Sequence, residues 1–526
     1  MLLLLIMTIY NNYLYKLIYN FLRVYKNSPI VQIFGYAYIL KLLLKTLFYS
    51  NTFLKLYVKK IPYIKNKIDN ETTTVIKKIK QDFDAEVSGI ISYTKLPDKG
   101  ISDETILNYF KSMKKKCTYD YTKGRVSGSV YSKNHTLDLL HNKLYLYFNK
   151  SNPLHSSVFP SIRFMENNLV SMMISLFNGD KDVCGTFTSG GTESILLACK
   201  AYRDYFKHIK YPEIIISSTG HCAFNKACGY FKIKLITIPC KIDGTFNTNE
   251  LEKYINTNTI LIVGSTPSYN LGIIDPIHEL AKIALKYNLP LHVDACIGVF
   301  LINYSGLKYD FSIKGVTSIS ADFHKYGHSP KGASCIMYNK KEILENQYFI
   351  DETWTGGIYA TSSITGSRSG NIVALTWATL VFYGNSTYLA NYQKIMVMKK
   401  HIINKINAIE ELYIIGNPQL SIIAISSDKI NINVLAEELK KKKWDLNVIQ
   451  NPNGFHICLT SYHTVEILDE FVKHIQEIIP IIKDNKTKFS PCIYGTMQKI
   501  NDNSIIRDVV KNYLHVLNDV SLKCLE

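Results

Sequence analysis

The sequence of 526 residues predicts an α/β protein with a mostly parallel central sheet, helices on both faces of that sheet, and a smaller α+β domain after it. Short apolar runs alternate with helical stretches in the middle of the chain, which is typical of strands joined by crossover helices. Polar residues with reactive side chains follow several of these runs, where parallel sheets place their sites. The expected strands lie at residues 214–217, 235–239, 260–264 and 291–294, and one expected helix spans 277–287.

Residues 1–60 form an apolar and basic segment that we expect to attach the chain to a membrane. Ten Lys or Arg and no Asp or Glu occur in residues 1–67, out of a net charge of +18. Neither of its two apolar runs has eighteen uninterrupted apolar residues, so a single span and a basic interfacial helix are both open, as is a buried arm in a dimer. No other basic module accompanies the segment, and we expect no nucleic-acid partner.

The rest of the chain divides into three further regions. Residues 61–123 are expected to form a helical linker and N-terminal arm, with Ser102 as the N-cap of a helix over 101–114. Residues 124–388 hold the predicted large domain. The eleven cysteines lack metal-ligand spacing and are typical of thiols in a reducing compartment. The predicted small domain and tail occupy residues 389–526, with strands at 420–426 and 455–460 and helices at 434–443, 464–482 and 505–516.

Lys325 is the residue around which the expected site is organised. It lies in the stretch S-I-S-A-D-F-H-K-Y-G-H-S-P-K-G-A-S at 318–334, a short polar segment after an apolar beginning. An isolated lysine is ordinarily a surface charge. Here the setting suits a lysine that forms a Schiff base, held in a partly desolvated site with its pKa lowered by neighbouring groups.

A glycine-rich turn provides what a pyridoxal phosphate lysine needs for the cofactor phosphate. The motif T-S-G-G-T-E-S at 188–194 precedes a helical run. Two glycines let the backbone approach a phosphate closely, and the helix N-terminus adds N–H donors. A plain helix start is the alternative for this motif alone. The candidate phosphate ligands are Gly190, Gly191 and Thr192.

Two further residues fit the ring of the same cofactor. Asp294 ends the apolar run at 291–294, where a carboxylate can pair with a protonated pyridine nitrogen. His221 follows the run at 214–217, where an imidazole can stack on the ring. Taken singly, Asp294 could cap a turn and His221 could be a loop histidine with ordinary partners.

The order of these motifs resembles the fold-type-I pyridoxal phosphate enzymes of the group II decarboxylase superfamily. The shared motifs are T-S-G-G-T-E-S, H-C-A-F-N-K-A, S-T-P-S-Y, H-V-D-A-C and S-I-S-A-D-F-H-K-Y-G. More narrowly, the chain resembles the sphingosine-1-phosphate lyase family over about residues 61–497. The motifs of this narrower match are G-R-V-S-G-S-V-Y at 124–131, S-N-P-L-H at 151–155, W-T-G-G-I-Y at 354–359, G-S-R at 366–368 and N-P-Q-L-S at 417–421.

The resemblance implies roles for residues beyond the first three stretches. Lys325 holds pyridoxal phosphate, and His324 beside it contacts the cofactor. Lys331 acts at the reacting centre, and Tyr269 is a weaker candidate for proton transfer near the C3 oxygen. Gly357 reaches the cofactor phosphate of the neighbouring subunit in a homodimer. The residues implied around the substrate phosphate are Tyr131, His155 and Arg368, together with Lys331.

The resemblance also implies a reaction and a location. The reaction is retro-aldol cleavage between C2 and C3 of a phosphorylated long-chain base, which releases a long-chain aldehyde and phosphoethanolamine. The location is the endoplasmic reticulum membrane, with one span and a cytosolic catalytic domain. Two other functions stay open: an amino-acid decarboxylase, which would release CO₂ and ignore a substrate phosphate, and a non-catalytic membrane protein on a decayed fold. A structural ion pair is the alternative for Arg368, and core packing is the alternative for Tyr131.

The sequence departs from the family pattern at three places near the lysine. Phe323 stands where the family usually has Thr, His328 replaces a common Tyr, and I-G-V at 297–299 replaces L-G-G. Because Phe323 removes a hydroxyl expected next to the cofactor, we expect an effect on cofactor affinity or rate.

Overall fold

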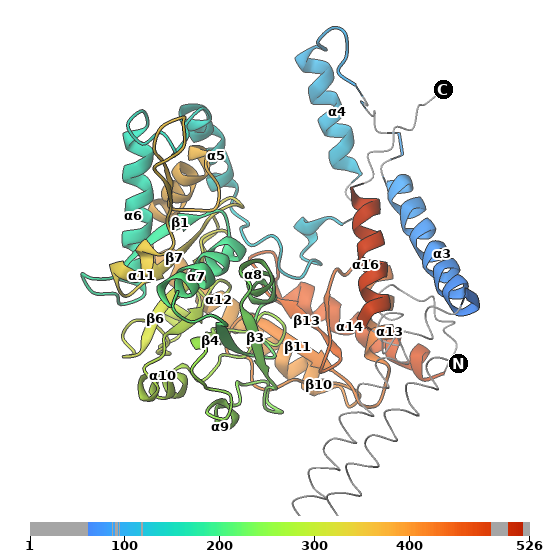
Figure 1. Ribbon diagram of the computed structural model, residues 1–526. Coiled ribbons are helices and arrows are strands. Elements are labelled where there is room, and N and C mark those ends of the chain that lie inside the picture. Colours follow the sequence, from blue (N-terminus) through green and yellow to red (C-terminus); the bar gives the residue numbers. More distant parts are fainter. Residues whose placement is uncertain are drawn as a thin grey trace, which may run out of the picture. The chain divides into compact units, whose positions relative to one another are not determined.

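The computed structural model describes residues 62–86, 88–89, 93, 95–116, 119–484 and 503–518, which fall into two compact units (Figure 1). The smaller unit contains the helices α3 (Pro62–Glu86), α4 (Asp103–Lys115) and α16 (Asn503–Leu517). The larger unit contains residues 119–484.

The smaller unit joins segments from both ends of the described chain. α16 packs against α3, with the rings of Phe83 and Tyr513 6.2 Å apart. Ser102 caps α4 as expected, because its side chain accepts a hydrogen bond from the Thr105 N–H at 3.3 Å. The predicted membrane segment at 1–60 lies outside the described residues. Among the residues that are described, no helix combines the length and the apolar character needed to cross a bilayer.

A seven-stranded sheet forms the centre of the larger unit. Its strands lie in the order β1-β7-β6-β5-β4-β2-β3. Five neighbours, from β6 to β3, are parallel, whereas β7 runs antiparallel between β1 and β6. The predicted mostly parallel sheet is confirmed, and the four expected strands match β2 to β5 within one residue. The bounds are β1 (Cys184–Thr188), β2 (Glu213–Ser217), β3 (Lys234–Ile238), β4 (Thr259–Ser265), β5 (Leu291–Asp294), β6 (Val316–Asp322) and β7 (Ser334–Tyr338).

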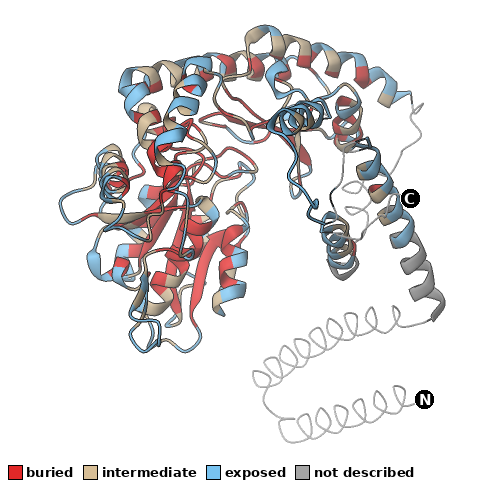
Figure 2. Ribbon diagram, turned by 90° about the horizontal axis from the view of Figure 1, so that it is seen from above, coloured by how far each residue is buried: buried red, intermediate tan, exposed pale blue. Residues whose placement is uncertain are grey.

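Helices cover both faces of this sheet, so its strands are apolar without alternation. In β2, Ile214 and Ile216 contribute to the core on one face, while Ile215 contributes to the core on the other. Figure 2 shows the resulting buried strands between helices whose outer sides are exposed. The first face carries α7 (Gly191–Tyr205), α8 (Ala223–Phe231) and α11 (Lys341–Glu345), and the second carries α6 (Pro160–Leu176), α10 (Ile277–Lys286) and α12 (Gly370–Asn407).

The C-terminal part has its own antiparallel sheet, in the order β10-β11-β13-β12, as the α+β prediction requires. α12 leads into it and crosses the predicted domain boundary at 388–389, with a break at Gly384 (φ 59°), a backbone conformation that favours glycine. The exact domain boundaries stay a prediction. The remaining elements are α5 (His135–Phe148), α9 (Thr248–Leu251), β8 (Phe349–Asp351), β9 (Tyr359–Thr361), β10 (Tyr413–Ile414), β11 (Ile422–Ser426), α13 (Ile432–Lys441), β12 (Asn447–Ile449), β13 (Gly454–Cys458) and α14 (Val465–Lys483), with short 3₁₀ turns at Tyr121–Lys123 and Ile302–Tyr304.

Candidate active site

A cavity of about 330 Å³, which we call the cofactor cavity, lies at the carboxyl edge of the sheet. Four chain segments converge there: the turn after β1, the loop after β2, the end of β5 and the loop after β6. They meet because the carboxyl ends of parallel strands share one edge. The cavity therefore brings together seven of the predicted residues. Its lining consists of Ser189, Gly190, Gly191, Thr192, Glu193, Ile195, His221, Asp294, Cys296, Asp322, His324 and Lys325.

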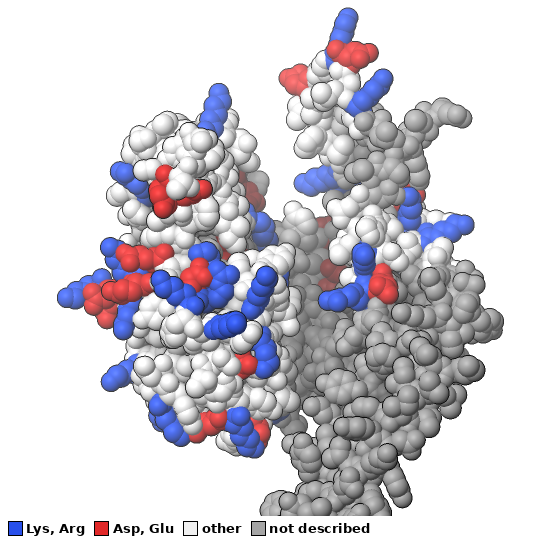
Figure 3. Space-filling model, in the orientation of Figure 1, with Lys and Arg blue, Asp and Glu red and all other residues white. Residues whose placement is uncertain are grey.

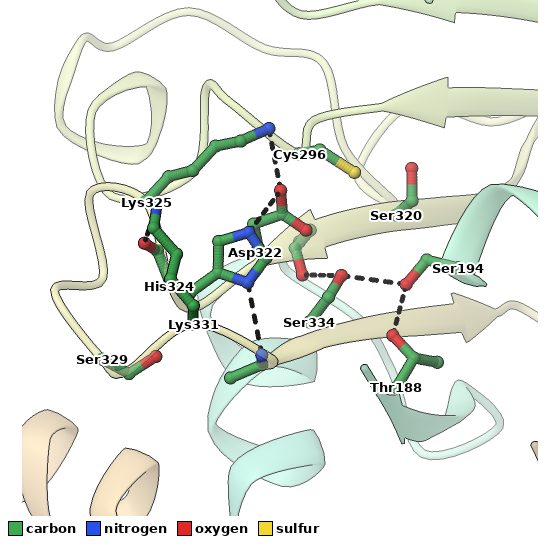
Figure 4. A network of polar contacts seen from close by, with 12 residues as sticks. Thr188, Ser194, Cys296, Ser320, Asp322, His324, Lys325, Ser329, Lys331 and Ser334 are labelled. Carbon is green, nitrogen blue, oxygen red and sulfur yellow. Dashed lines mark hydrogen bonds and ion pairs between the residues drawn. The ribbon is translucent and has the colours of Figure 1, made fainter. Parts of the chain in front are cut away.

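Lys325 is held by an ion pair at the end of β6. Its Nζ lies 2.8 Å from Oδ2 of Asp322, whose side chain is only 1% exposed. Figure 4 shows the lysine curving back so that its amine points to this carboxylate. The strand end therefore supplies both the loop that carries the amine and the carboxylate that orients it.

The electrostatics of Lys325 correct one expectation from the sequence. Burial lowers its pKa, but the ion pair and hydrogen bond with Asp322, together with the nearby Cys296 and Asp294, outweigh burial and leave the pKa above the ordinary value. The predicted lowered pKa of Lys325 is therefore wrong, because the Asp322 carboxylate lies within ion-pair distance of the amine. On the Asp322 side, burial opposes ionisation, and Lys325 nevertheless holds the pKa of the carboxyl below its usual range.

His324 lines both the cofactor cavity and a second, neighbouring cavity. Its Nε2 is 3.6 Å from Oδ2 of Asp322, and its Nδ1 accepts a hydrogen bond from the Ala333 N–H at 3.2 Å. Burial lowers the pKa of the ring below the ordinary value. The neutral ring therefore carries its proton on Nε2, facing the Asp322 carboxylate.

Asp294 lines the cavity from the end of β5 and is 7% exposed. Its Oδ1 accepts hydrogen bonds from the Cys296 N–H at 3.1 Å and from the Ser320 hydroxyl at 3.2 Å. Both contacts engage the same oxygen. The arrangement fixes the carboxylate at the strand end and leaves its other oxygen without a hydrogen bond from the described residues.

The glycine turn passes a direct test of fit for a phosphorylated cofactor. A Cβ at position 191 would lie 2.8 Å from Sγ of Cys296 and 2.9 Å from Oδ1 of Asp322, so this position accepts only glycine. The backbone at the start of α7 thus borders the cavity directly, and its first N–H groups have no partner within the helix. With a lysine and a strand-end aspartate in the same cavity, the residues present fit pyridoxal phosphate.

A second cavity of about 380 Å³ shares His324 with the cofactor cavity. Two of its lining residues, Lys331 and Tyr131, were predicted near the substrate phosphate. The Nζ of Lys331 lies 4.8 Å from the centre of the Tyr131 ring and donates to the His324 carbonyl at 3.4 Å. Burial, with added repulsion from Lys325, lowers the pKa of Lys331 to about 8. Tyr131 is 6% exposed, and burial raises the pKa of its phenol well above the ordinary value.

Tyr269 stands between His221 and the C-terminal sheet. Its ring is 6.3 Å from that of His221 and 5.0 Å from that of His456 in β13. Its hydroxyl donates to Oδ1 of Asn447 in β12 at 3.2 Å. Burial raises the pKa of Tyr269, so its phenol is neutral near physiological pH. The C-terminal sheet therefore orients this side chain beside the cofactor cavity.

Three further predicted residues, Arg368, His155 and Gly357, line neither of the two cavities. Arg368 forms an ion pair with Glu166 of α6 at 2.6 Å, which was the structural alternative for this residue. His155 is exposed in the loop before α6, and the same loop receives the Arg368 N–H at Oδ1 of Asn152 (3.3 Å). Gly357 is exposed in the loop between β8 and β9, with φ at 104° and open space around it.

Two residues that depart from the family pattern, Phe323 and His328, do not line the cofactor cavity. Phe323 is fully buried, and its ring stacks on Phe187 at 5.7 Å. His328 separates the second cavity from α12, where its Nδ1 lies 3.3 Å from the Tyr383 hydroxyl. The side chain at position 323 therefore belongs to the apolar core and does not line the cofactor cavity.

Asp322 is the main site residue that the sequence argument missed. An acidic residue at the end of an apolar run, three positions before the key lysine, was the available signal. Cys296, which borders Gly191, was also missed, because an isolated cysteine in an apolar stretch is typical of core packing.

The fold and the cofactor cavity together define a pyridoxal phosphate-dependent enzyme. Comparison with known proteins supports this class, because the pyridoxal-dependent decarboxylase conserved domain matches residues 130–427. Sphingosine-1-phosphate lyase 1 of Rattus norvegicus is 39% identical over 477 residues, covering 88% of this chain and 83% of the relative. Sphingosine-1-phosphate lyase of Saccharomyces cerevisiae is 36% identical over 527 residues, covering 96% and 87%. The chain belongs to the sphingosine-1-phosphate lyase family within the pyridoxal-dependent decarboxylases.

Solved structures agree with this membership. The sphingosine-1-phosphate lyase of Burkholderia pseudomallei superposes with a TM-score of 0.73 at 31% identity, covering 76% of this chain and 95% of that chain. A glutamate decarboxylase of Lactobacillus brevis superposes with a TM-score of 0.66 at 20% identity, covering 76% and 96%. The second likeness concerns the fold alone.

Proposed function

We infer that this chain is a pyridoxal phosphate-dependent lyase that cleaves the C2–C3 bond of phosphorylated sphingoid bases, releasing a long-chain aldehyde and phosphoethanolamine. The observation that carries this inference is the pair of adjoining cavities. One holds Lys325 and Asp294, and the other holds Lys331, for which the described residues provide no ion-pair partner within 4 Å. A cation without a carboxylate partner suits a substrate phosphate. An amino-acid decarboxylase is the less supported alternative.

Several residues of the cofactor cavity would hold the cofactor. We assign its attachment to the Lys325 amine, its pyridine nitrogen to Asp294, its ring to His221 and its phosphate to the turn at 190–192, with His324 alongside. Bound pyridoxal phosphate supplies an electron sink for bond cleavage. The chain's own contribution is to orient these groups in a cavity whose three carboxylates, Asp294, Asp322 and Glu193, are all buried.

Cleavage requires proton transfer at two substrate atoms. A base takes the proton of the C3 hydroxyl, so that the C3 oxygen becomes the carbonyl of the leaving aldehyde, and an acid later gives a proton to C2. With its pKa lowered to about 8, Lys331 exists as ammonium and as amine near that pH. We therefore assign Lys331 either to the phosphate or to the proton transfer, with the neutral phenol of Tyr269 as a further candidate donor.

The phosphate end of the substrate extends beyond the second cavity in this proposal. Tyr131 lies in that cavity, while His155 and Arg368 belong to two loops joined by Asn152. Nδ2 of Asn152 also donates to the Ser367 hydroxyl at 3.0 Å. We propose that these two loops approach the substrate phosphate in the assembled enzyme, with Arg368 oriented by Glu166.

We also propose a homodimer in which Gly357 approaches the partner's cofactor phosphate. Large apolar side chains are exposed on α5 and in the loop between β8 and β9, and exposed apolar surface is typical of interfaces between subunits. On the face shown in Figure 3, charged side chains gather over the lower part of the larger unit and are sparse over α5 and α6. The exposed residues include Tyr145, Leu146, Tyr147, Trp354 and Ile358.

Membrane attachment and endoplasmic reticulum location are proposals that rest on residues 1–60. Residues 1–67 contain ten Lys or Arg and no Asp or Glu, and this positive charge favours binding to an anionic cytosolic membrane surface. The match to the yeast relative extends over 96% of this chain and so reaches into this segment. Fractionation of cells expressing the full chain and a chain lacking residues 1–60 tests the proposal, which predicts that only the full chain sediments with membranes.

The catalytic proposal is tested with purified protein and a long-chain sphingoid base phosphate, with the unphosphorylated base run in parallel. Aldehyde and phosphoethanolamine are measured, and CO₂ release from amino acids is measured separately. We expect aldehyde from the phosphorylated substrate only. Cofactor-loaded protein that releases CO₂ and no aldehyde would support the decarboxylase instead.

A further inference from the structure

Glu193 is a buried acid of the cofactor cavity to which no role has yet been assigned. It lies in the first turn of α7 and is 7% exposed. Its Oε2 accepts the Ser189 N–H at 2.6 Å, and its Oε1 accepts the Ile364 N–H at 2.9 Å. One carboxylate thus joins the turn that borders the cofactor phosphate to a segment about 170 residues further along the chain.

The second segment, residues 362–368, carries Arg368 at its end. Asn152 and Glu166 hold its far end, and Gln347, which is 2% exposed, holds its beginning. Nε2 of Gln347 donates to the Ser362 carbonyl at 2.5 Å and to the Thr186 hydroxyl of β1 at 2.8 Å. Gln347 therefore holds the same segment as Glu193 but makes no hydrogen bond to the turn at 189–192.

We propose that Glu193 is a positioning residue that sets the spacing between the cofactor-phosphate turn and the segment 362–368. Both of its acceptor oxygens are used by backbone N–H groups, so the side chain acts through the two segments and not on a reacting atom. Because a buried N–H that loses its acceptor is costly, removal of the carboxylate displaces both segments. This inference rests on the proposed function, since it assigns cofactor phosphate to one segment and substrate phosphate to the other.

The proposal predicts that cofactor affinity and substrate affinity both change in Glu193 variants. In Gln347 variants, only substrate affinity changes. Glu193→Ala removes both acceptors. Glu193→Gln keeps the size of the side chain but leaves only one acceptor oxygen, so its effect is smaller. Gln347→Ala loosens residues 362–364 and leaves the contact between Glu193 and Ser189 in place.

The experiment uses the full chain freed of cofactor. The Kd for pyridoxal phosphate is measured by fluorescence titration, and the KM for a sphingoid base phosphate is measured after reloading. We expect Glu193→Ala to raise both values by about tenfold or more, Glu193→Gln to raise both by less, and Gln347→Ala to raise only KM. If Glu193→Ala does not fold, Glu193→Gln provides the comparison.

A cofactor Kd within twofold of the wild type in both Glu193 variants would overturn the proposal. An equal rise of the cofactor Kd in Gln347→Ala would overturn it as well, because the effect would then be general loosening of the fold. If the wild type binds pyridoxal phosphate and produces no aldehyde, the lyase assignment fails, while the cofactor titrations still decide the role of Glu193.

Discussion

The cofactor cavity and the second cavity share His324 but set their lysines in opposite electrostatic environments. In the first, Asp322 lies 2.8 Å from Lys325 and raises its pKa. In the second, Lys331 faces the ring of Tyr131, and burial lowers its pKa to about 8. Five residues of one loop thus lie between a lysine held in an ion pair and a lysine whose pKa is about 8. The difference shows that burial lowers the pKa of a lysine amine and that a carboxylate in direct contact with the amine reverses this effect.

The comparison predicts that Lys325 and Lys331 differ most in what their removal does. Lys325→Ala should lower the lyase rate by a factor on the order of 10³ or more, because the attachment point of the cofactor is lost. The visible absorbance of the bound cofactor should change in this variant and persist in Lys331→Ala. Aldehyde release and absorbance spectra measure the two effects. Wild-type-like turnover by Lys325→Ala would remove the basis for assigning the first cavity to the cofactor.

The ion pair that distinguishes the first cavity should be visible as stability. We expect Asp322→Asn to lower the free energy of unfolding of the cofactor-free protein by about 3 kcal/mol, because it leaves the Lys325 ammonium without its partner. Asp294→Asn is the matched control, since its Oδ1 can keep both hydrogen bonds. Urea denaturation of the two variants measures the difference, and equal losses would contradict the assigned importance of the pair.

The same pair predicts a pH window for this stability difference. The folded-state pKa of Asp322 is lowered, so its contribution is full above the unfolded carboxyl pKa of about 3.9 and is lost as pH falls through the lower folded value. The folded-state pKa of Lys325 is raised, so its contribution is full below about 10.4 and is lost as pH rises through the higher folded value. The contribution of the pair to wild-type stability should therefore be constant between about pH 4 and 10, whereas in Asp322→Asn burial lowers the Lys325 pKa and narrows the difference toward the alkaline end of that window.

The second cavity should show a more moderate effect that depends on pH. Lys331→Ala should reduce kcat/KM for the phosphorylated substrate by about 10- to 100-fold, the usual value of a charge-assisted hydrogen bond. In the wild type, the apparent affinity should fall as pH rises through about 8, because the Lys331 ammonium is lost there. Lys331→Arg keeps its charge and should move this fall to higher pH. A profile that is the same in Lys331→Arg and wild type would show that another group titrates.

The smallest effect is expected at Phe323, which directly precedes His324 in sequence but lines neither cavity. Phe323→Leu should lower the free energy of unfolding by about 1 kcal/mol through lost packing on Phe187. The Kd for pyridoxal phosphate should stay within about twofold of the wild type. Thermal unfolding and cofactor titration check the two values. A tenfold rise in Kd would mean that residue 323 influences the cofactor directly.

Much of the fold and of the cofactor cavity could be predicted because both have local signatures. Strands β2 to β5 coincide with continuous apolar runs, Asp294 ends one such run, and His221 lies shortly after another. The glycine turn and Lys325 occur in motifs whose order is shared with a known family. The burial of Phe323 could not be predicted from its place beside His324, since a residue that precedes a site residue in sequence can point into the core on the other side of the strand end.

The features that could not be predicted depend on residues far apart in the chain. Arg368 pairs with Glu166, and α16 packs on α3, although long stretches of sequence separate them. The antiparallel β7 within a parallel sheet also has no local signal, because strand direction does not alter the apolar pattern of a buried strand.

The sequence by itself therefore determined the alternation of strands and helices, the lysine, the phosphate turn and the family. These follow from the period of apolar residues and from short motifs, which are local properties. Only the tertiary structure decided that Asp322 raises the pKa of Lys325, that Lys331 occupies a separate cavity, and that Glu193 joins two distant segments. The physical reason is that charge interactions and buried hydrogen bonds depend on distance and on the exclusion of water, which the folded chain alone establishes.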